Sequence, residues 1–160
     1  GAMLLRREVV EQLPDWYFRC PVGDRPLELL AALKGYCHYA DRFDSAYRFH
    51  GAGSWTEEMK SGDLKKKQDA YAIAMRELYR AFDRDSGGRY HRAAVSAARR
   101  VYFLTRVNLR DYDEIFSPRY LRYYRELSLR DRGFIRAERT LPFLFAGLRR
   151  LRDRIFRQEG

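Results

Sequence analysis

The sequence has little cysteine and no long apolar run. Its 160 residues contain 2 cysteines, Cys20 and Cys37, which match no zinc-ligand spacing and are too few for a disulfide framework. No segment approaches the ~20 consecutive apolar residues that a membrane-spanning helix needs. Nothing at the start resembles a signal peptide. These absences argue against a zinc module, a disulfide scaffold and a membrane span, and we expect a soluble, cytoplasmic protein.

Charge of one sign is in large excess. The formal net charge is +10, and arginine supplies nearly all of it. Such a surplus suits an acidic partner, namely nucleic acid, anionic lipid headgroups or phosphorylated substrates; it is equally compatible with an arginine-rich surface that binds nothing. A hydrophobic fraction of 46% with 15% aromatic residues supplies enough apolar surface to offset the entropy of ordering. The chain is therefore expected to fold, but its charge alone does not select a partner.

The pattern of apolar residues changes near residue 55. A helix is predicted over 24–34, because Asp24 stands near its cap, Pro26 in its first turn and Gly35 just past its end. Residues 36–40 and 43–49 read as two short strands. Helical spacing then predicts helices over 57–82, 90–110, 117–127 and 140–157. We predict an α+β fold, predominantly α-helical, with a domain boundary between 1–56 and 57–160.

Five short motifs follow one another between residues 13 and 56. They are LPDW at 13–16, PVGDRPL at 21–27, LLAALKG at 29–35, YRFH at 47–50 and GAGSWT at 51–56. Their order and spacing resemble the C-terminal end of the catalytic domain in family 2 glycosyltransferases. The resemblance implies a truncated GT-A-like fragment in 1–56 followed by a helical extension. It also implies an inverting enzyme of cell-envelope polysaccharide biosynthesis, which transfers a sugar from a nucleotide-sugar to a saccharide or lipid-linked acceptor.

The same resemblance assigns roles to individual residues. Asp24 matches the family's catalytic base, a carboxylate that takes the proton of a sugar hydroxyl and stays ionised at a helix N-terminus. Sequence patterns alone favour a helix N-cap role for Asp24. Arg48, Ser54 and Trp55 are expected to contact the donor diphosphate or the acceptor. His50 matches a histidine that helps to hold a divalent metal, Mn or Mg, against the diphosphate.

Two parts of the family pattern do not occur in this sequence. The alternating strands and helices that bind the nucleotide are missing, and no DxD-type metal motif precedes residue 24. Asp83-Arg84-Asp85 has the letters of that motif but follows the catalytic segment, so we discount it. We therefore expect no bound metal in this chain and no sugar transfer by it without a nucleotide-binding half.

The end of the chain predicts a basic amphipathic helix. Over 141–157, apolar residues at helical spacing alternate with arginines. Such a helix either lies on anionic lipid or buries its apolar face against preceding helices. The first outcome would place the protein peripherally on the inner face of the membrane.

Two other functions stay open. Arg84 and His91 fit the loose Arg-x4–6-His pattern of HEPN-type ribonucleases, and the net positive charge suits RNA. Ser86-Gly87-Gly88 interrupts the helix that such a motif should occupy, so nucleic acid is the less favoured partner. A helical interaction module is the third alternative, and it gains support if Asp24, Arg48 and His50 lie far apart.

Overall fold

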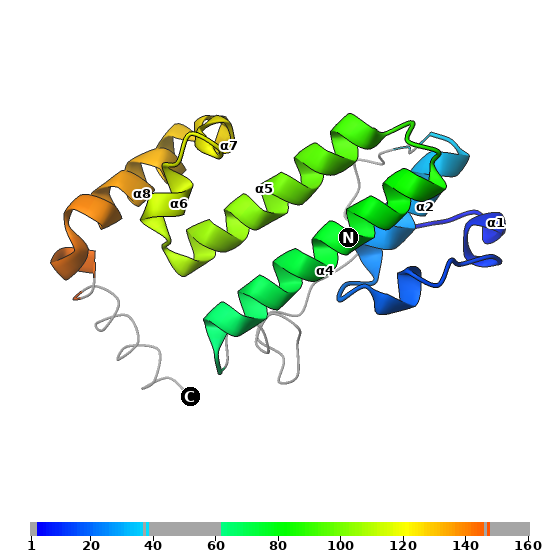
Figure 1. The fold of residues 1–160 in the computed structure, drawn as a ribbon, viewed down its shortest axis with the longest axis horizontal. Helices are drawn as coiled ribbons and strands as arrows, with labels where there is room; N and C mark the ends of the chain where they lie inside the picture. Colours follow the sequence, from blue (N-terminus) through cyan, green and yellow to red (C-terminus); the bar gives the residue numbers. More distant parts are fainter. Residues whose placement is uncertain (1–2, 37, 39–61, 146, 148–160) are drawn as a thin grey trace. The chain divides into compact units, whose positions relative to one another are not determined.

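The computed structural model describes residues 3–36, 38, 62–145 and 147, and this part of the chain is helical (Figure 1). The chain divides into two compact units, Gly1–Thr105 and Arg106–Gly160. The helices are α1 (Arg7–Val10), the 3₁₀-helix η1 (Tyr17–Arg19), α2 (Asp24–Lys34), α4 (Leu64–Asp85), α5 (His91–Leu109), α6 (Tyr112–Ile115), α7 (Leu121–Glu126) and α8 (Leu129–Thr140).

The predicted α+β fold is wrong, because the described residues contain no strand. Tyr36 and His38, from the first predicted strand, lie in irregular backbone, and Tyr36 is fully exposed. The rest of 36–40 and all of 43–49 lie outside the described residues. A strand is stable only when its backbone pairs with a neighbour, and short aromatic runs have the same pattern in exposed loops. The architecture is therefore helical where the GT-A-like fragment was expected to be mixed.

Helix α2 confirms the helix predicted over 24–34, but its N-cap differs from the expectation. The N-cap residue is Gly23, which makes no side-chain cap bond, and Asp24 is the first helical residue. The helix ends where the Gly35 N–H donates to the Ala31 carbonyl at 3.2 Å. Pro26, within the first turn, is buried, and it costs no hydrogen bond there because first-turn N–H groups have no partner inside the helix. Asp24 is thus not the N-cap residue, and its Oδ1 accepts from the first-turn N–H of Arg25 at 2.7 Å.

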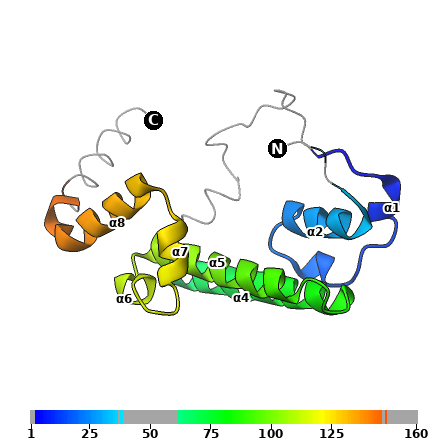
Figure 2. The ribbon, with the colours of Figure 1, turned by 90° about the horizontal axis from the view of Figure 1, so that it is seen from above.

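Helices α4 and α5 form an antiparallel helical hairpin, seen side by side in Figures 1 and 2. The turn between them is a Schellman motif: the Gly88 N–H donates to the Asp83 carbonyl at 2.8 Å and the Gly87 N–H to the Arg84 carbonyl at 3.0 Å. Gly87 and Gly88 have φ of 63° and 77°, a left-handed conformation that favours glycine. The glycine pair predicted to break the helix therefore reverses the chain direction.

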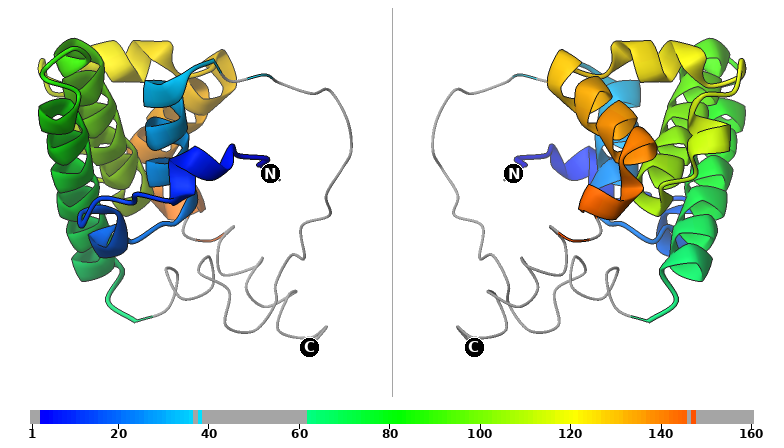
Figure 3. Two further views of the ribbon diagram at one scale, coloured as in Figure 1. Left: turned by 90° about the vertical axis from the view of Figure 1, so that its right-hand side faces the viewer. Right: turned by 90° about the vertical axis from the view of Figure 1, so that its left-hand side faces the viewer.

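The core of the first unit lies between η1, α2 and the α4–α5 hairpin (Figures 2 and 3). Met75 and Leu78 are 1% and 2% exposed, and fully burying one such side chain contributes about 1.5–3 kcal/mol. The leucines of α2 pack against this cluster from one side, and α1 in turn packs against α2. The buried members of the cluster are Trp16, Met75, Leu78, Tyr79, Ala81, Phe82 and Ala94.

The second unit is held by aromatic side chains and by ion pairs with one buried partner, such as that between Arg110 and Glu138. The rings of Phe116 and Tyr124 lie 4.9 Å apart, and the Tyr124 hydroxyl donates to the Arg132 carbonyl at 3.1 Å. Arg110 Nε lies 2.6 Å from Glu138 Oε1, whose side chain is 7% exposed. These contacts join α6, α7 and α8 to the residues that follow α5.

The helix predictions after residue 57 are partly confirmed. The predicted 57–82 helix is α4, displaced toward the C-terminus, and 57–61 lie outside the described residues. The 90–110 prediction matches α5, whereas α6 and α8 were not predicted. Half of the residues of α8 are charged and Gly133 lies inside it, so few apolar residues mark it as a helix. Of 140–157, residues 142–145 are helical and 148–157 lie outside the described part.

The predicted domain boundary at 56/57 also lies outside the described residues, and it stays a prediction. Residues from both sides of that position contribute to the core of the first unit. Along the chain, the division between the two compact units falls between Thr105 and Arg106, within α5.

Candidate functional site

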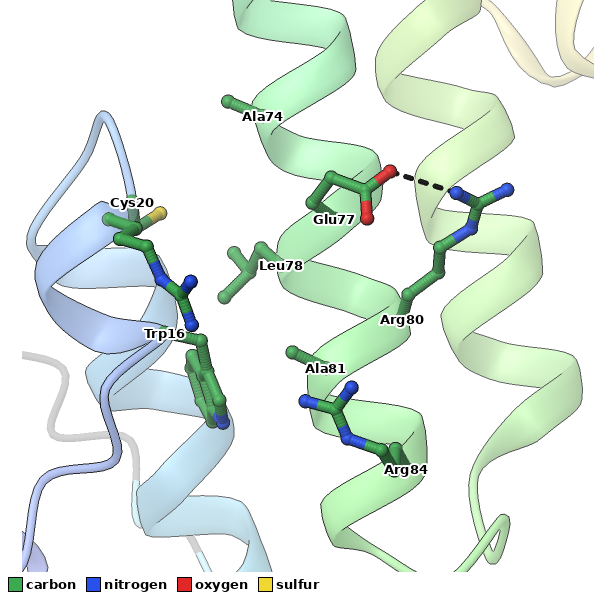
Figure 4. Close-up of a pocket in the computed structure, with 9 residues that line it drawn as sticks. Trp16, Cys20, Ala74, Glu77, Leu78, Arg80, Ala81 and Arg84 are labelled. Carbon is green, nitrogen blue, oxygen red and sulfur yellow. Dashed lines mark hydrogen bonds and ion pairs between the residues drawn. The ribbon is translucent and has the colours of Figure 1, made fainter.

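The first unit contains a pocket of 430 Å³ between the segment around η1 and helix α4 (Figure 4). Trp16, Arg19 and Cys20 form one wall, and successive turns of α4 form the other. Two alanines on α4 leave the pocket open between its longer side chains. The α4 residues in its lining are Ala74, Glu77, Leu78, Arg80, Ala81 and Arg84.

Asp85 links the two walls of this pocket. Trp16 Nε1 donates to Asp85 Oδ2 at 2.5 Å, and Arg84 Nε lies 3.6 Å from Asp85 Oδ1. Trp16 is 7% exposed, and a buried indole N–H needs a hydrogen-bond acceptor. The Asp85 carboxylate is that acceptor. Figure 4 shows the Arg84 side chain extending toward Trp16. The carboxylate of Asp85 therefore restrains the Trp16 ring and lies beside the exposed Arg84 guanidinium at the pocket.

The pocket carries more positive than negative charge. Glu77 Oε1 lies 2.8 Å from Arg80 Nη1 and 3.6 Å from Arg76 Nε, so one carboxylate serves two guanidinium groups. Arg19 is exposed and makes no ion pair within the part of the chain that the structure describes. Three arginines and one glutamate line the pocket, which gives its lining a net charge of +2.

Asp24 lies close enough to this pocket to act on its lining. Burial raises the pKa of the Cys20 thiol, a hydrogen bond from the backbone of Val22 lowers it, and the negative charge of Asp24 raises it further. The Asp24 side chain is exposed, and its Oδ1 accepts from the Arg25 N–H at 2.7 Å. The Arg25 guanidinium pairs with Glu28, at 2.5 Å. The Asp24 carboxylate thus faces solvent beside the pocket.

The other predicted site residues lie outside the described residues. This holds for Arg48, His50, Ser54 and Trp55. Whether they share a cleft with Asp24 stays a prediction. Among the described residues, no group of three or more His, Cys, Asp and Glu side chains could hold a metal ion; with His50 outside this part, the expected metal site is untested.

The acidic residues of Asp83-Arg84-Asp85 are engaged in hydrogen bonds. His91 Nδ1 lies 2.6 Å from Asp83 Oδ2, and Asp85 bonds to Trp16. Both carboxylates therefore have structural partners, which agrees with discounting this run as a metal motif. Arg84 and His91, the residues of the ribonuclease-like pattern, pair with different aspartates, Asp85 and Asp83, both of which precede the glycine turn.

The sequence motifs identified Asp24 but not the pocket beside it. Trp16 and Asp85 are separated by 69 positions, and no local spacing relates such residues. The sequence signal for the pocket was the spacing of Arg80 and Arg84, which places two arginines on one face of a helix. The same spacing is common on helix faces that contact only solvent.

Comparison with protein-family models, with curated proteins and with solved structures found no match to this chain. Over the residues that the structure describes, no helix combines the length and the apolar character needed to cross a membrane.

Proposed function

We propose that this chain carries the acceptor-side base of an inverting glycosyltransferase, with Asp24 as that base. The observation that supports the proposal most is the position of Asp24. It lies in the first turn of α2, within the PVGDRPL motif. Its exposed carboxylate is not the N-cap and makes no ion pair with Arg25, and its Oδ1 accepts from the Arg25 backbone N–H. A base must keep an accessible carboxylate, and the exposure of the Asp24 side chain meets that requirement.

The proposed reaction is a single displacement at the anomeric carbon of the donor. A carboxylate oxygen of Asp24 takes the proton of the acceptor hydroxyl, whose oxygen bonds to the anomeric carbon. The bond from that carbon to the donor diphosphate breaks as the new bond forms. In the complete enzyme, a divalent metal would neutralise charge on the diphosphate, with His50 as one expected ligand.

The proposal is tested on the natural gene product that contains this chain, assayed with a panel of nucleotide-sugars and saccharide acceptors. Asp24→Asn should lower kcat by about 10²- to 10⁴-fold, the usual contribution of a general base, with little change in KM for the donor. Glu28→Gln, one turn further along α2 and also exposed in part, is the matched control and should keep its activity. Turnover of Asp24→Asn within twofold of the parent would refute the role of Asp24, and no transfer from any donor would refute the reaction.

We further propose that the second unit docks on an anionic lipid surface at the inner face of the membrane. Near the end of α8, the side chains of Leu141, Phe143 and Leu144 are 50%, 90% and 62% exposed. Arg136 and Arg139 precede them and are exposed as well. Exposed apolar side chains beside arginines are typical of interfacial segments, in which the rings enter the lipid and the guanidinium groups meet phosphates. Co-sedimentation with anionic vesicles tests this docking.

A further inference from the structure

We infer that the pocket lined by Trp16, Arg19, Cys20 and helix α4 binds a phosphate-bearing ligand. This inference concerns a second group of residues in the first unit and does not depend on the role proposed for Asp24. It rests on the charge of the lining, on the restraint of the Trp16 ring and on the size of the pocket.

The charge of the lining favours an anion. Arg19 has no ion pair in the described part of the chain, and Arg80 shares the Glu77 carboxylate with Arg76. Guanidinium groups bind phosphate oxygens through paired N–H donors, so incompletely neutralised arginines around one opening are suited to a phosphate. Glu77 is the one acidic side chain in the lining, and its pairing with Arg80 turns that negative charge away from the Trp16 wall (Figure 4).

The Trp16 ring is also held in place before any ligand arrives. Asp85 accepts from the Trp16 indole, whereas the Arg84 side chain, 3.6 Å from the same carboxylate, is 75% exposed and open to a ligand. Restraining a binding group in the free protein reduces the entropy lost on binding. Cys20 adds no opposing charge, because burial raises the pKa of its thiol and keeps it protonated at neutral pH.

The pocket is large enough for more than a single phosphate. A volume of 430 Å³ falls in the range of small-molecule sites. The Trp16 ring and the alanine side chains of α4 offer apolar surface next to the arginines. A ligand with a phosphate or diphosphate end and a less polar body fits this division, and nucleotides and lipid-linked phosphates share that chemistry.

The test uses the fluorescence of Trp16. The chain has 2 tryptophans, so Trp55→Phe leaves Trp16 as the only reporter. Because Trp55 is itself a predicted binding residue, calorimetric titration of the unsubstituted chain with the same ligands measures the affinity without this change. Titration with inorganic pyrophosphate at low salt should give a saturable change in fluorescence. Arg84→Gln should weaken binding by at least about fivefold, the effect of losing one charge-assisted contact. Arg84→Lys keeps the positive charge but loses the paired N–H donors of the guanidinium, so its affinity should lie between those of the parent and Arg84→Gln.

Arg92→Gln is the matched control, because Arg92 is exposed on α5 and does not line the pocket. Its affinity should equal that of the parent. Parallel titrations with a nucleoside diphosphate, a short-chain prenyl diphosphate and the corresponding prenyl alcohol identify the source of the phosphate: the alcohol should not bind, and the tighter of the two diphosphates names the class. Absence of saturable binding of all phosphates, or equal weakening by Arg84→Gln and Arg92→Gln, would overturn the inference.

Discussion

At the residue scale, the contact between Trp16 and Asp85 connects segments that the sequence separates by 69 positions. Trp16 belongs to a motif that resembles a catalytic segment, whereas Asp85 is the last residue of α4. The indole contributes in two ways, since its ring is buried in the core and its N–H is satisfied by a carboxylate. A residue with both functions is costly to replace even by another aromatic residue.

Replacing Trp16 with Phe should destabilise the first unit by about 1–2 kcal/mol. The substitution removes a hydrogen bond to a charged acceptor, and because the Asp85 side chain is 37% exposed, water recovers part of that loss. Urea unfolding followed by far-UV circular dichroism measures the change. The control is Phe18→Leu, whose side chain is 71% exposed and whose effect should stay within about 0.5 kcal/mol. Equal stability of the two variants would mean that the hydrogen bond contributes nothing.

The pKa of Cys20 reports on the position of Asp24. Burial is the larger cause of the raised pKa, and the negative charge of Asp24 adds to it because it disfavours the thiolate. Asp24→Asn should therefore lower the pKa of Cys20, so that the thiolate forms at a lower pH, while burial keeps that pKa above the ordinary value of about 8.5.

Iodoacetamide alkylation as a function of pH measures this effect in a Cys37→Ser background. The midpoint should move to lower pH in Asp24→Asn. Glu28→Gln serves as the control, because Glu28 does not act on Cys20. An unchanged midpoint in Asp24→Asn would show that Asp24 is not beside the pocket.

At the scale of elements, the turn between α4 and α5 places the two helices of the hairpin side by side. The Schellman motif ends α4 at Asp85 and places the next helix alongside it. A side chain added at Gly87 would meet open space, so the only obstacle to substitution there is its φ of 63°. This position therefore isolates the cost of left-handed backbone from any packing effect.

Gly87→Ala should cost about 1–2 kcal/mol, the penalty of a left-handed conformation for a residue with a Cβ atom. Gly133→Ala provides a comparison of opposite sign. Gly133 lies inside α8 and an added Cβ also meets open space, so alanine should stabilise the second unit by about 0.5–1 kcal/mol through helix propensity. Thermal unfolding of both variants measures the two effects. Stabilisation by Gly87→Ala would contradict the turn described here.

At the scale of the whole molecule, positive charge is distributed unevenly between the two units. Arg106–Gly160 contains 14 arginines, 8 acidic residues and no lysine, a net charge of +6 out of the total +10. Arginine binds phosphate groups through paired donors, whereas lysine acts as a point charge. The second unit thus combines most of the charge excess with the exposed apolar side chains after α8.

Binding of the chain to vesicles that contain anionic lipid should weaken as salt is added, because screening reduces the attraction between arginines and headgroups. Phe143→Ala combined with Leu144→Ala should weaken co-sedimentation by at least about tenfold, since two largely exposed apolar side chains no longer enter the lipid. Arg92→Gln, in the first unit, is the control and should bind as the parent does. Equal binding to neutral and anionic vesicles would contradict an electrostatic contribution, and no binding at low salt would refute the docking.

The sequence by itself determined the helices with a strong apolar period and clear boundary residues. Asp24, Pro26 and Gly35 located α2, and the glycine pair at 87–88 located the end of α4, because such residues act through their own backbone geometry. The motifs of 13–56 also led to Asp24 as a candidate base. The predicted α+β fold class was wrong for the described residues, since a strand depends on a paired neighbour that local pattern does not reveal.

Only the tertiary structure decided which distant side chains meet. The pairing of Trp16 with Asp85, the sharing of Glu77 by two arginines and the ion pair of Arg110 with Glu138 each depend on how helices turn toward one another. Helix α8 shows the same limit, because contacts such as that ion pair hold a helix in which half of the residues are charged and few apolar ones mark its position. Periodicity specifies a face of a helix; packing selects the partner of that face.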